Sequence, residues 1–130
     1  MVGVIIATHG QFAEGLVDTA KMFADNISNI KVLPLNTSTS LDDYFDETME
    51  AIEEVDEGDG VIALVDILGG TPSTTLFRAK NKFHKNVKIV TGLNLPMMVA
   101  LLTELEENTN MDDLAKSLVE AGTLHISIME

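Results

Sequence analysis

The sequence predicts an α/β protein in which a mostly parallel β-sheet is covered by helices on both faces. Short apolar segments rich in β-branched residues, typical of buried strands, alternate with longer segments whose apolar residues recur every three or four positions, as on one helix face. Single helices between strands imply right-handed β-α-β crossovers, which produce parallel strands. With 130 residues, the chain is long enough for one domain with a real core, and we expect residues 1–130 to form it.

Four strands and the helices between them account for the chain up to residue 91. The expected strands, all short and apolar, are Val2–Thr8, Ile30–Leu35, Val61–Asp66 and Val87–Thr91. The expected helices, all periodic in their apolar residues, are Gln11–Ala24, an acidic helix from Leu41 to the turn at Gly58, and Thr71 to about Lys82. Ser40 and Asp43 resemble a capping box, and Thr71 as N-cap with Pro72 at the first helical position is expected to open the helix that follows.

The C-terminal part departs from this alternation. Asn94 begins one helix, and Asn110 caps a second helix, residues 111–121, directly after it. Each helix reverses the chain, so the last strand is expected to run antiparallel to the other four. This strand is residues 123–129, in which apolar and polar side chains alternate as expected near a sheet edge.

The composition excludes several classes of function. The absence of cysteine excludes disulfides, thiolate metal sites and cysteine nucleophiles, and with no signal segment we expect a cytoplasmic protein. The formal net charge is −13, and ten acidic residues lie between Asp42 and Asp59 with no base among them. Nucleic acid is therefore not expected as a partner, because its phosphates would be repelled. A protein partner is expected to present a basic surface.

Two polar residues stand at strand ends. His9 lies just past the first expected strand, and Asp66 closes the third. In open parallel sheets, ligands bind beyond the carboxyl ends of the strands, where neighbouring connections leave on opposite faces. If the strands lie in the flavodoxin-like order 2-1-3-4, His9 and Asp66 meet at that point. The carboxylate would then fix the imidazole tautomer and leave the other ring nitrogen as a nucleophile or a metal ligand.

A glycine turn beside this pair is suited to binding an anion. Gly69, Gly70 and Thr71 offer backbone N–H groups at the start of a helix, Thr71 adds a hydroxyl, and a second helix begins just after Gly10. Phosphate is a common occupant of such sites, so the histidine, the carboxylate and the turn together suggest a phosphohistidine. These loops contain no lysine or arginine, which argues against tight nucleotide binding and suits a group that must be passed on.

Each of these residues also has a simpler interpretation. A lone histidine after a strand is more often structural than catalytic, an aspartate there can simply cap the turn, and Gly-Gly before Thr-Pro is a common helix start. Only their combination at equivalent strand ends favours chemistry. A regulatory domain that holds a small anion without transfer is an alternative. A metal-assisted hydrolase would need more clustered ligands, and the zinc-helix, P-loop and GxGxxG motifs are absent, so we expect neither metal nor cofactor.

Three segments together resemble a known family. They are Ile5–Gly10 followed by Ala13–Leu16, then Val65–Pro72, and then Gly92–Met97. In this order and spacing they are similar to the mannose-family IIA domain of the bacterial phosphoenolpyruvate-dependent sugar phosphotransferase system (PTS), and the likeness covers essentially the whole chain. The phosphoryl-donor subunit of dihydroxyacetone kinase shares the fold and the histidine, but the Gly-Gly-Thr-Pro turn and the Asn-Leu-Pro-Met loop favour the IIA domain.

The resemblance implies a phosphotransferase activity. His9 would accept a phosphoryl group from the phosphocarrier protein HPr and pass it to a IIB component, which phosphorylates a sugar entering through the membrane components IIC and IID. Asp66 would hold the imidazole, and Gly70 and Thr71 would bind the phosphoryl oxygens. The family is typically a homodimer in which the antiparallel C-terminal strand, here residues 123–129, pairs with the sheet of the other subunit; a mostly apolar edge segment fits that protected position.

Overall fold

The structure, a computed structural model, describes residues 1–24, 28–83, 86–107 and 109–130. Its strands form a four-stranded parallel sheet in the order β2-β1-β3-β4. The strands are β1 (Gly3–His9), β2 (Ile30–Leu35), β3 (Val61–Val65) and β4 (Val87–Thr91). The predicted α/β class, strand order and parallel direction are therefore confirmed.

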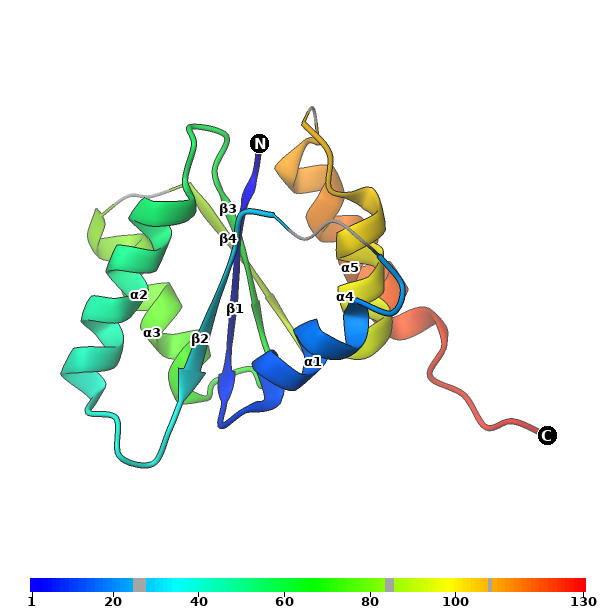
Figure 1. Cartoon of the computed structure of the whole chain (residues 1–130), viewed down its shortest axis with the longest axis horizontal. Helices are drawn as coiled ribbons and strands as arrows, with labels where there is room; N and C mark the ends of the chain where they lie inside the picture. Colours follow the sequence, from blue (N-terminus) through cyan, green and yellow to red (C-terminus); the bar gives the residue numbers. More distant parts are fainter. Residues whose placement is uncertain (25–27, 84–85, 108) are drawn as a thin grey trace.

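Helices cover both faces of the sheet and give three layers (Figure 1). The helices of the described residues are α1 (Phe12–Ala20), α2 (Leu41–Val55), α3 (Thr71–Phe83), α4 (Leu95–Glu104) and α5 (Met111–Leu124). α2 and α3 lie on one face, whereas α1, α4 and α5 lie on the other. This arrangement leaves the carboxyl ends of the strands, where the predicted site residues lie, uncovered by a helix layer.

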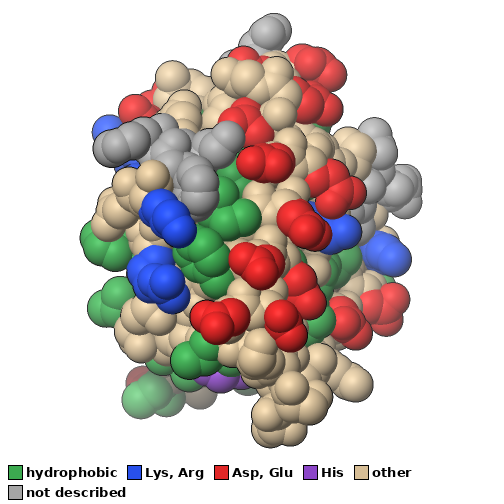
Figure 2. Space-filling model, turned by 90° about the vertical axis from the view of Figure 1, so that its left-hand side faces the viewer, with side chains coloured by type: hydrophobic (Ala, Val, Ile, Leu, Met, Phe, Trp, Pro, Cys, Tyr) green, Lys and Arg blue, Asp and Glu red, His purple; other side chains and the backbone are tan. Residues whose placement is uncertain are grey.

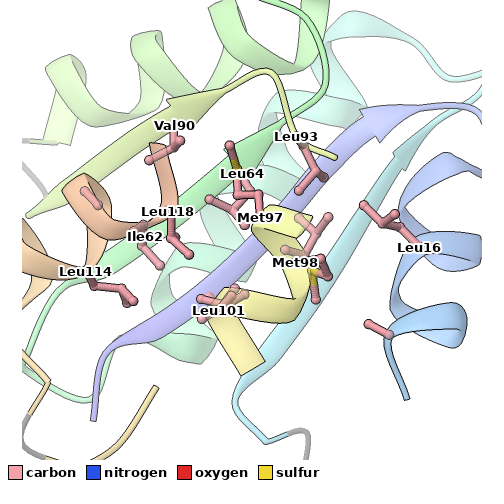
Figure 3. Close-up of a cluster of buried hydrophobic side chains, with 14 of the residues drawn as sticks. Leu16, Ile62, Leu64, Val90, Leu93, Met97, Met98, Leu101, Leu114 and Leu118 are labelled. Carbon is pink, nitrogen blue, oxygen red and sulfur yellow. The ribbon is translucent and has the colours of Figure 1, made fainter. Parts of the chain in front are cut away.

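Each face of the sheet has its own hydrophobic core, because successive side chains of a strand point to opposite faces. In β1, Val4 and Ile6 belong to the core under α1, α4 and α5, whereas Ile5 and Ala7 belong to the core under α2 and α3. β1 and β3 are the central strands and are buried almost throughout, which explains their continuous apolar sequences. Figure 3 shows the first core, where the buried Met98 of α4 packs beside the strands.

The predicted side-chain caps are present on three helices. Ser40, Asn94 and Asn110 each accept a hydrogen bond from the backbone N–H three residues later, at 3.1, 3.0 and 3.1 Å. These bonds satisfy N–H groups that have no acceptor within the helix. α3 differs from the prediction, because Thr71 is its first helical residue and not its cap.

α1 is shorter than the predicted Gln11–Ala24 helix. It ends at Ala20, whose carbonyl accepts the N–H of Phe23 at 2.9 Å in a tighter turn. Leu16 and Ala20 are buried as predicted, but Phe12 and Phe23 are 46% and 56% exposed. The apolar periodicity therefore overestimated the buried face at both ends of this helix.

The C-terminal segment requires a further correction. α5 continues to Leu124 and residues 125–130 form no strand, so the antiparallel strand predicted over 123–129 is not formed within the described chain. Gly122, which follows the predicted helix 111–121, remains helical, and its carbonyl accepts a hydrogen bond from Nδ2 of Asn94 at 2.8 Å. Beyond α5 the tail extends away from the sheet (Figure 1), where a strand has no neighbour to pair with.

Candidate active site

His9 and Asp66 meet at the carboxyl end of the sheet. β1 and β3 are parallel neighbours with Ala7 opposite Val65, so the residues that follow this pair emerge side by side. Nδ1 of His9 lies 2.9 Å from Oδ2 of Asp66, and the backbone N–H of His9 donates to the same oxygen at 3.0 Å. The structure thus brings together the two side chains that topology alone had suggested would meet.

Asp66 is a mostly buried, ionised acceptor. Its side chain is 13% exposed, and its second oxygen, Oδ1, accepts the N–H of Ile67 at 3.0 Å. Burial is the largest single influence and raises its pKa, but the hydrogen bonds and charge of His9, with a smaller contribution from the N–H of Ile67, together leave the pKa of Asp66 below its usual value. Because a carboxylate can only accept, the hydrogen lies on Nδ1 of His9, and Nε2 carries the free lone pair.

The imidazole of His9 is open to solvent but lies against Gly70 at its reactive edge. The His9 side chain is 45% exposed. A Cβ atom at position 70 would lie 2.8 Å from Cε1 of His9 and 3.4 Å from Nε2, and the first of these distances is shorter than real Cβ contacts. Only glycine allows this close approach, so a group bound to Nε2 would lie beside the start of α3.

Two of the predicted phosphoryl-binding glycines have N–H groups that are already engaged. The N–H of Gly69 donates to Oγ of Ser73 at 3.0 Å, and the N–H of Gly10 donates to the carbonyl of Leu35 at 2.7 Å. Gly69 and Gly10 have φ angles of +85° and +56°, a region that favours glycine. These two glycines therefore contribute to the site by allowing the two loops their backbone conformation.

Gly70 and Thr71 carry donors at the start of α3 that no strong hydrogen bond to a described residue uses. The N–H of Gly70 makes only a long bond of 3.4 Å to the carbonyl of Ile67. Within the described residues, the N–H and hydroxyl of Thr71 have no protein partner. These groups lie at the N-terminus of α3, where the helix dipole favours negative charge. The site can therefore offer an anion neutral donors next to Nε2 of His9.

Two buried hydroxyls that the sequence analysis did not single out support the loops. Oγ1 of Thr8, which is fully buried, accepts the N–H of Ala13 at 2.9 Å and anchors the start of α1 behind His9. Ser73 is 7% exposed and accepts the Gly69 N–H. Serine side chains commonly bond to nearby backbone groups, but the sequence offers Thr71 and Ser73 alike for such a bond, so it did not single out Ser73.

Among the described residues, no further histidine adds a ligand to this site. His125 is exposed at the end of α5, and His84 lies outside the described residues. No group of three or more His, Asp and Glu side chains in the described ranges is arranged to hold a metal ion. The loop after β4 does adjoin the site, since the N–H of Leu93 donates to the carbonyl of Val65, the residue before Asp66, at 3.0 Å.

The sheet order and the carboxylate-bound histidine at its carboxyl end define a flavodoxin-like α/β protein with an exposed histidine site. The chain belongs to the EIIA-man family, described as the PTS system fructose IIA component, whose profile matches residues 3–119. Family membership gives it, in general terms, a phosphotransfer role in a sugar phosphotransferase system. Across the described residues, every helix is too short or too polar to cross a membrane.

Individual relatives agree with this assignment. The chain is 28% identical over 122 residues to the PTS system mannose-specific EIIAB component of Escherichia coli (strain K12), covering 93% of this chain and 37% of that protein. It is also 28% identical over 120 residues to the PTS system fructose-specific EIIA component of Bacillus subtilis (strain 168), covering 91% and 80%. The mannose/sorbose specific IIA subunit from Enterococcus faecalis has the same fold, with a TM-score of 0.87 at 22% identity over 99% and 95% of the two chains.

Proposed function

We propose that this protein is a phosphoryl-relay IIA component in which His9 accepts a phosphoryl group from phospho-HPr and passes it to a IIB component. IIB would then phosphorylate a sugar during its uptake through IIC and IID, and residues 1–130 would act as one cytoplasmic IIA domain. The observation that carries the proposal is the 2.9 Å contact between Nδ1 of His9 and Asp66, which leaves Nε2 as an exposed nucleophile. Membership of the EIIA-man family supports the same chemistry.

The transfer needs one nucleophilic atom and one fixed charge. In the first step, the Nε2 lone pair forms a bond to phosphorus while the bond from phosphorus to the donor breaks, and the donor keeps that electron pair. The hydrogen on Nδ1 stays in place, and the Asp66 carboxylate stabilises the positive charge that develops on the ring. In the second step, a nucleophile of IIB bonds to phosphorus, the N–P bond breaks, and the pair returns to Nε2.

The phosphoryl oxygens would be bound by the start of α3. The N–H groups of Gly70 and Thr71 and the Thr71 hydroxyl are the donors beside Nε2. Gly69 and Gly10, whose N–H groups are engaged elsewhere, would shape the loops around the phosphoryl group. Neutral donors hold an anion less firmly than lysine or arginine would, which suits a group that must leave again.

Exposed apolar side chains around His9 provide a docking surface for both protein partners. Phe12, Ile67 and Leu68 are 46%, 58% and 78% exposed; Phe12 is the first residue of α1, and Ile67 and Leu68 lie in the loop between β3 and α3. Donor and acceptor must approach the same atom, Nε2, so they would use this surface in turn. Figure 2 shows one face on which acidic side chains cover the middle and right, with basic side chains at the left and a few among the acidic ones. A mostly acidic surface of this kind favours a basic partner.

The C-terminal tail and the outer edge of β4 suit a homodimer. Among the described strands, β4 pairs only with β3. A groove of about 550 Å³ lies beside β4 and α3, and its lining combines apolar with basic side chains, including Leu68, Phe77, Ile89, Arg78, Lys80 and Lys88. Residues 125–130 of a second copy, apolar in alternation and acidic at the end, would pair with β4 as the antiparallel fifth strand of the sheet.

A reconstituted relay tests the proposed function. The protein is incubated with phosphoenolpyruvate, enzyme I and HPr, and acid-labile phosphate on the chain is measured. Wild type and His125→Ala should be labelled, because His125 is exposed at the end of α5, whereas His9→Ala should not. Label retained by His9→Ala, or no label on wild type, would reject the relay.

A further inference from the structure

Ser73 holds the turn that lies against the reactive ring. It is the third residue of α3, is 7% exposed, and its Oγ accepts the N–H of Gly69 at 3.0 Å. Gly69 has a φ of +85°. A glycine pair is conformationally free, so fixing it in one position has an entropic cost that a specific bond must offset. Two side chains bond to this turn: the Ser73 hydroxyl accepts from Gly69, and Oγ1 of Thr74 donates to the carbonyl of Gly70 at 3.3 Å. The Ser73 bond is the shorter of the two and is made at the residue with positive φ.

The turn transmits this constraint directly to His9. Gly70 follows Gly69 and lies so close to the imidazole that a Cβ there would come within 2.8 Å of Cε1. The Gly70 N–H makes only a 3.4 Å bond of its own, so it does little to fix the turn. A shift of Gly69 would therefore move both the Gly70 backbone that lies against the imidazole and the donors of Gly70 and Thr71.

We propose that Ser73 is a positioning residue for phosphoryl transfer, a role that rests on the proposed function of His9. Its hydroxyl holds the Gly69–Gly70 turn in the conformation that places the donors of Gly70 and Thr71 beside Nε2. The same bond removes the Gly69 N–H from the set of donors available to the phosphoryl group. Ser73 thereby determines which backbone groups bind the anion without touching the anion itself.

The alternative is that Ser73 only stabilises the start of α3. A purely structural role would change the stability of the fold but not the ring environment of His9 or the maximal transfer rate. Two variants remove the acceptor in different ways. Ser73→Ala deletes the oxygen, and Ser73→Cys keeps a side chain of similar size whose sulfur is a weak acceptor. Ser117→Ala is the matched control, because Ser117 is a hydrogen-bonded serine on a different helix, α5.

Amide hydrogen exchange and NMR of the unphosphorylated protein test the positioning itself. Both Ser73 variants should raise the exchange rate of the Gly69 amide about 2- to 12-fold, the factor that corresponds to one net hydrogen bond, and should shift the ring signals of His9. They should lower the maximal rate of phosphoryl uptake by a similar factor and leave the HPr concentration for half-maximal rate unchanged. Ser117→Ala should match wild type in all four measurements.

Several results would overturn the proposal. Unchanged Gly69 exchange in both variants would show that the bond does not hold the turn. Faster exchange with unchanged His9 signals and an unchanged maximal rate would show a structural role only. If Ser73→Ala does not fold, Ser73→Cys decides the question by the same criteria. Failure of the relay is distinguishable, because wild type would then take up no phosphate while the exchange and ring signals still report on Ser73.

Discussion

Gly70→Ala places a methyl group at the point where the chain touches the reactive ring. The new Cβ would lie 2.8 Å from Cε1 of His9, so ring and loop must separate by about 0.6 Å to reach an ordinary contact of 3.4 Å. The added methyl group is attached directly to the loop backbone, and the His9 ring that it meets is held by Asp66, with 2.9 Å between Nδ1 and Oδ2. If the ring yields, the distance from Nδ1 to Oδ2 increases to about 3.5 Å, where a hydrogen bond is largely lost.

The size of the effect follows from the bond that is weakened. A hydrogen bond to a charged group contributes roughly 1.5–3 kcal/mol, and each 1.36 kcal/mol corresponds to a tenfold change in rate. If that contribution is realised mainly as the ring becomes positively charged, Gly70→Ala should slow phosphoryl uptake about 10- to 100-fold. Global stability should change much less, because His9 is 45% exposed and lies outside both cores.

The assay is the initial rate at which phosphate appears on the protein from phospho-HPr. Gly15→Ala is the matched control: its added Cβ meets nothing within 4 Å, and alanine inside α1 should favour the helix by about 0.5–1 kcal/mol. Gly15→Ala should therefore transfer at the wild-type rate. A Gly70→Ala protein that transfers as fast as wild type would refute the reasoning, because it would show that the loop moves away from the ring without consequence.

Three further predictions concern the same site and the proposed interfaces. Asp66→Asn should slow uptake about 10- to 100-fold, as loss of a group that orients a reactive histidine commonly does. Because the folded-state pKa of Asp66 is lowered, its ionised form stabilises the fold above the unfolded pKa, and this stabilisation is lost as pH falls through the folded pKa. In denaturant titrations, wild type should therefore lose more unfolding free energy than Asp66→Asn from pH 7 to about 3. Leu68→Ser should raise the HPr concentration for half-maximal rate, whereas Val119→Ser, a change at another exposed apolar residue but on α5, should not. Removal of residues 125–130 should convert a dimer to a monomer in sedimentation at micromolar concentration, and a wild-type monomer there would contradict strand exchange.

The strands and the meeting of His9 with Asp66 were predictable from the sequence for physical reasons. The central strands β1 and β3 are buried on both faces and are therefore apolar at almost every position. The half-buried edge strands Ile30–Leu35 and Val87–Thr91 are still short, mostly apolar segments between amphipathic helices, and they were placed with the correct bounds. A parallel sheet brings all carboxyl ends to one edge, so only the order of strands was needed to join two residues 57 positions apart. These features depend on patterns that every residue of an element shares.

The details that sequence reasoning missed depend on single contacts. Thr71 with Pro72 was expected to cap α3, yet the bond at this end is made by Ser73 to Gly69, and nothing in the periodicity distinguishes the two hydroxyls. Likewise, a glycine N–H offers the same donor in sequence whether it faces a ligand or, as at Gly10, a neighbouring carbonyl. Donor availability is a property of the folded loop.

The C-terminal tail shows a different limit of sequence reasoning. Alternating apolar and polar residues predict a strand, but a strand exists only where another strand supplies its hydrogen bonds. In the described chain, α5 continues through Gly122, and the tail after Leu124 leaves the sheet with Ile128 85% exposed. The pattern therefore describes a segment that is suited to pairing, and the neighbour it needs is not provided by its own sheet.

The distribution of charge bears on why the site can release what it binds. Five of the eight basic residues lie between Arg78 and Lys88, and the loops that carry His9 and Thr71 contain none. A lysine bonded to the phosphoryl group would add a charge-assisted bond of roughly 1.5–3 kcal/mol. Unless that bond strengthened in the transition state, it would stabilise the phosphohistidine and slow its transfer to the acceptor. In the proposed relay, placing the fixed charge of Asp66 at Nδ1, on the far side of the ring from Nε2, would avoid this. Asp66 would stabilise the positive imidazole that forms with the N–P bond without contacting the phosphoryl oxygens.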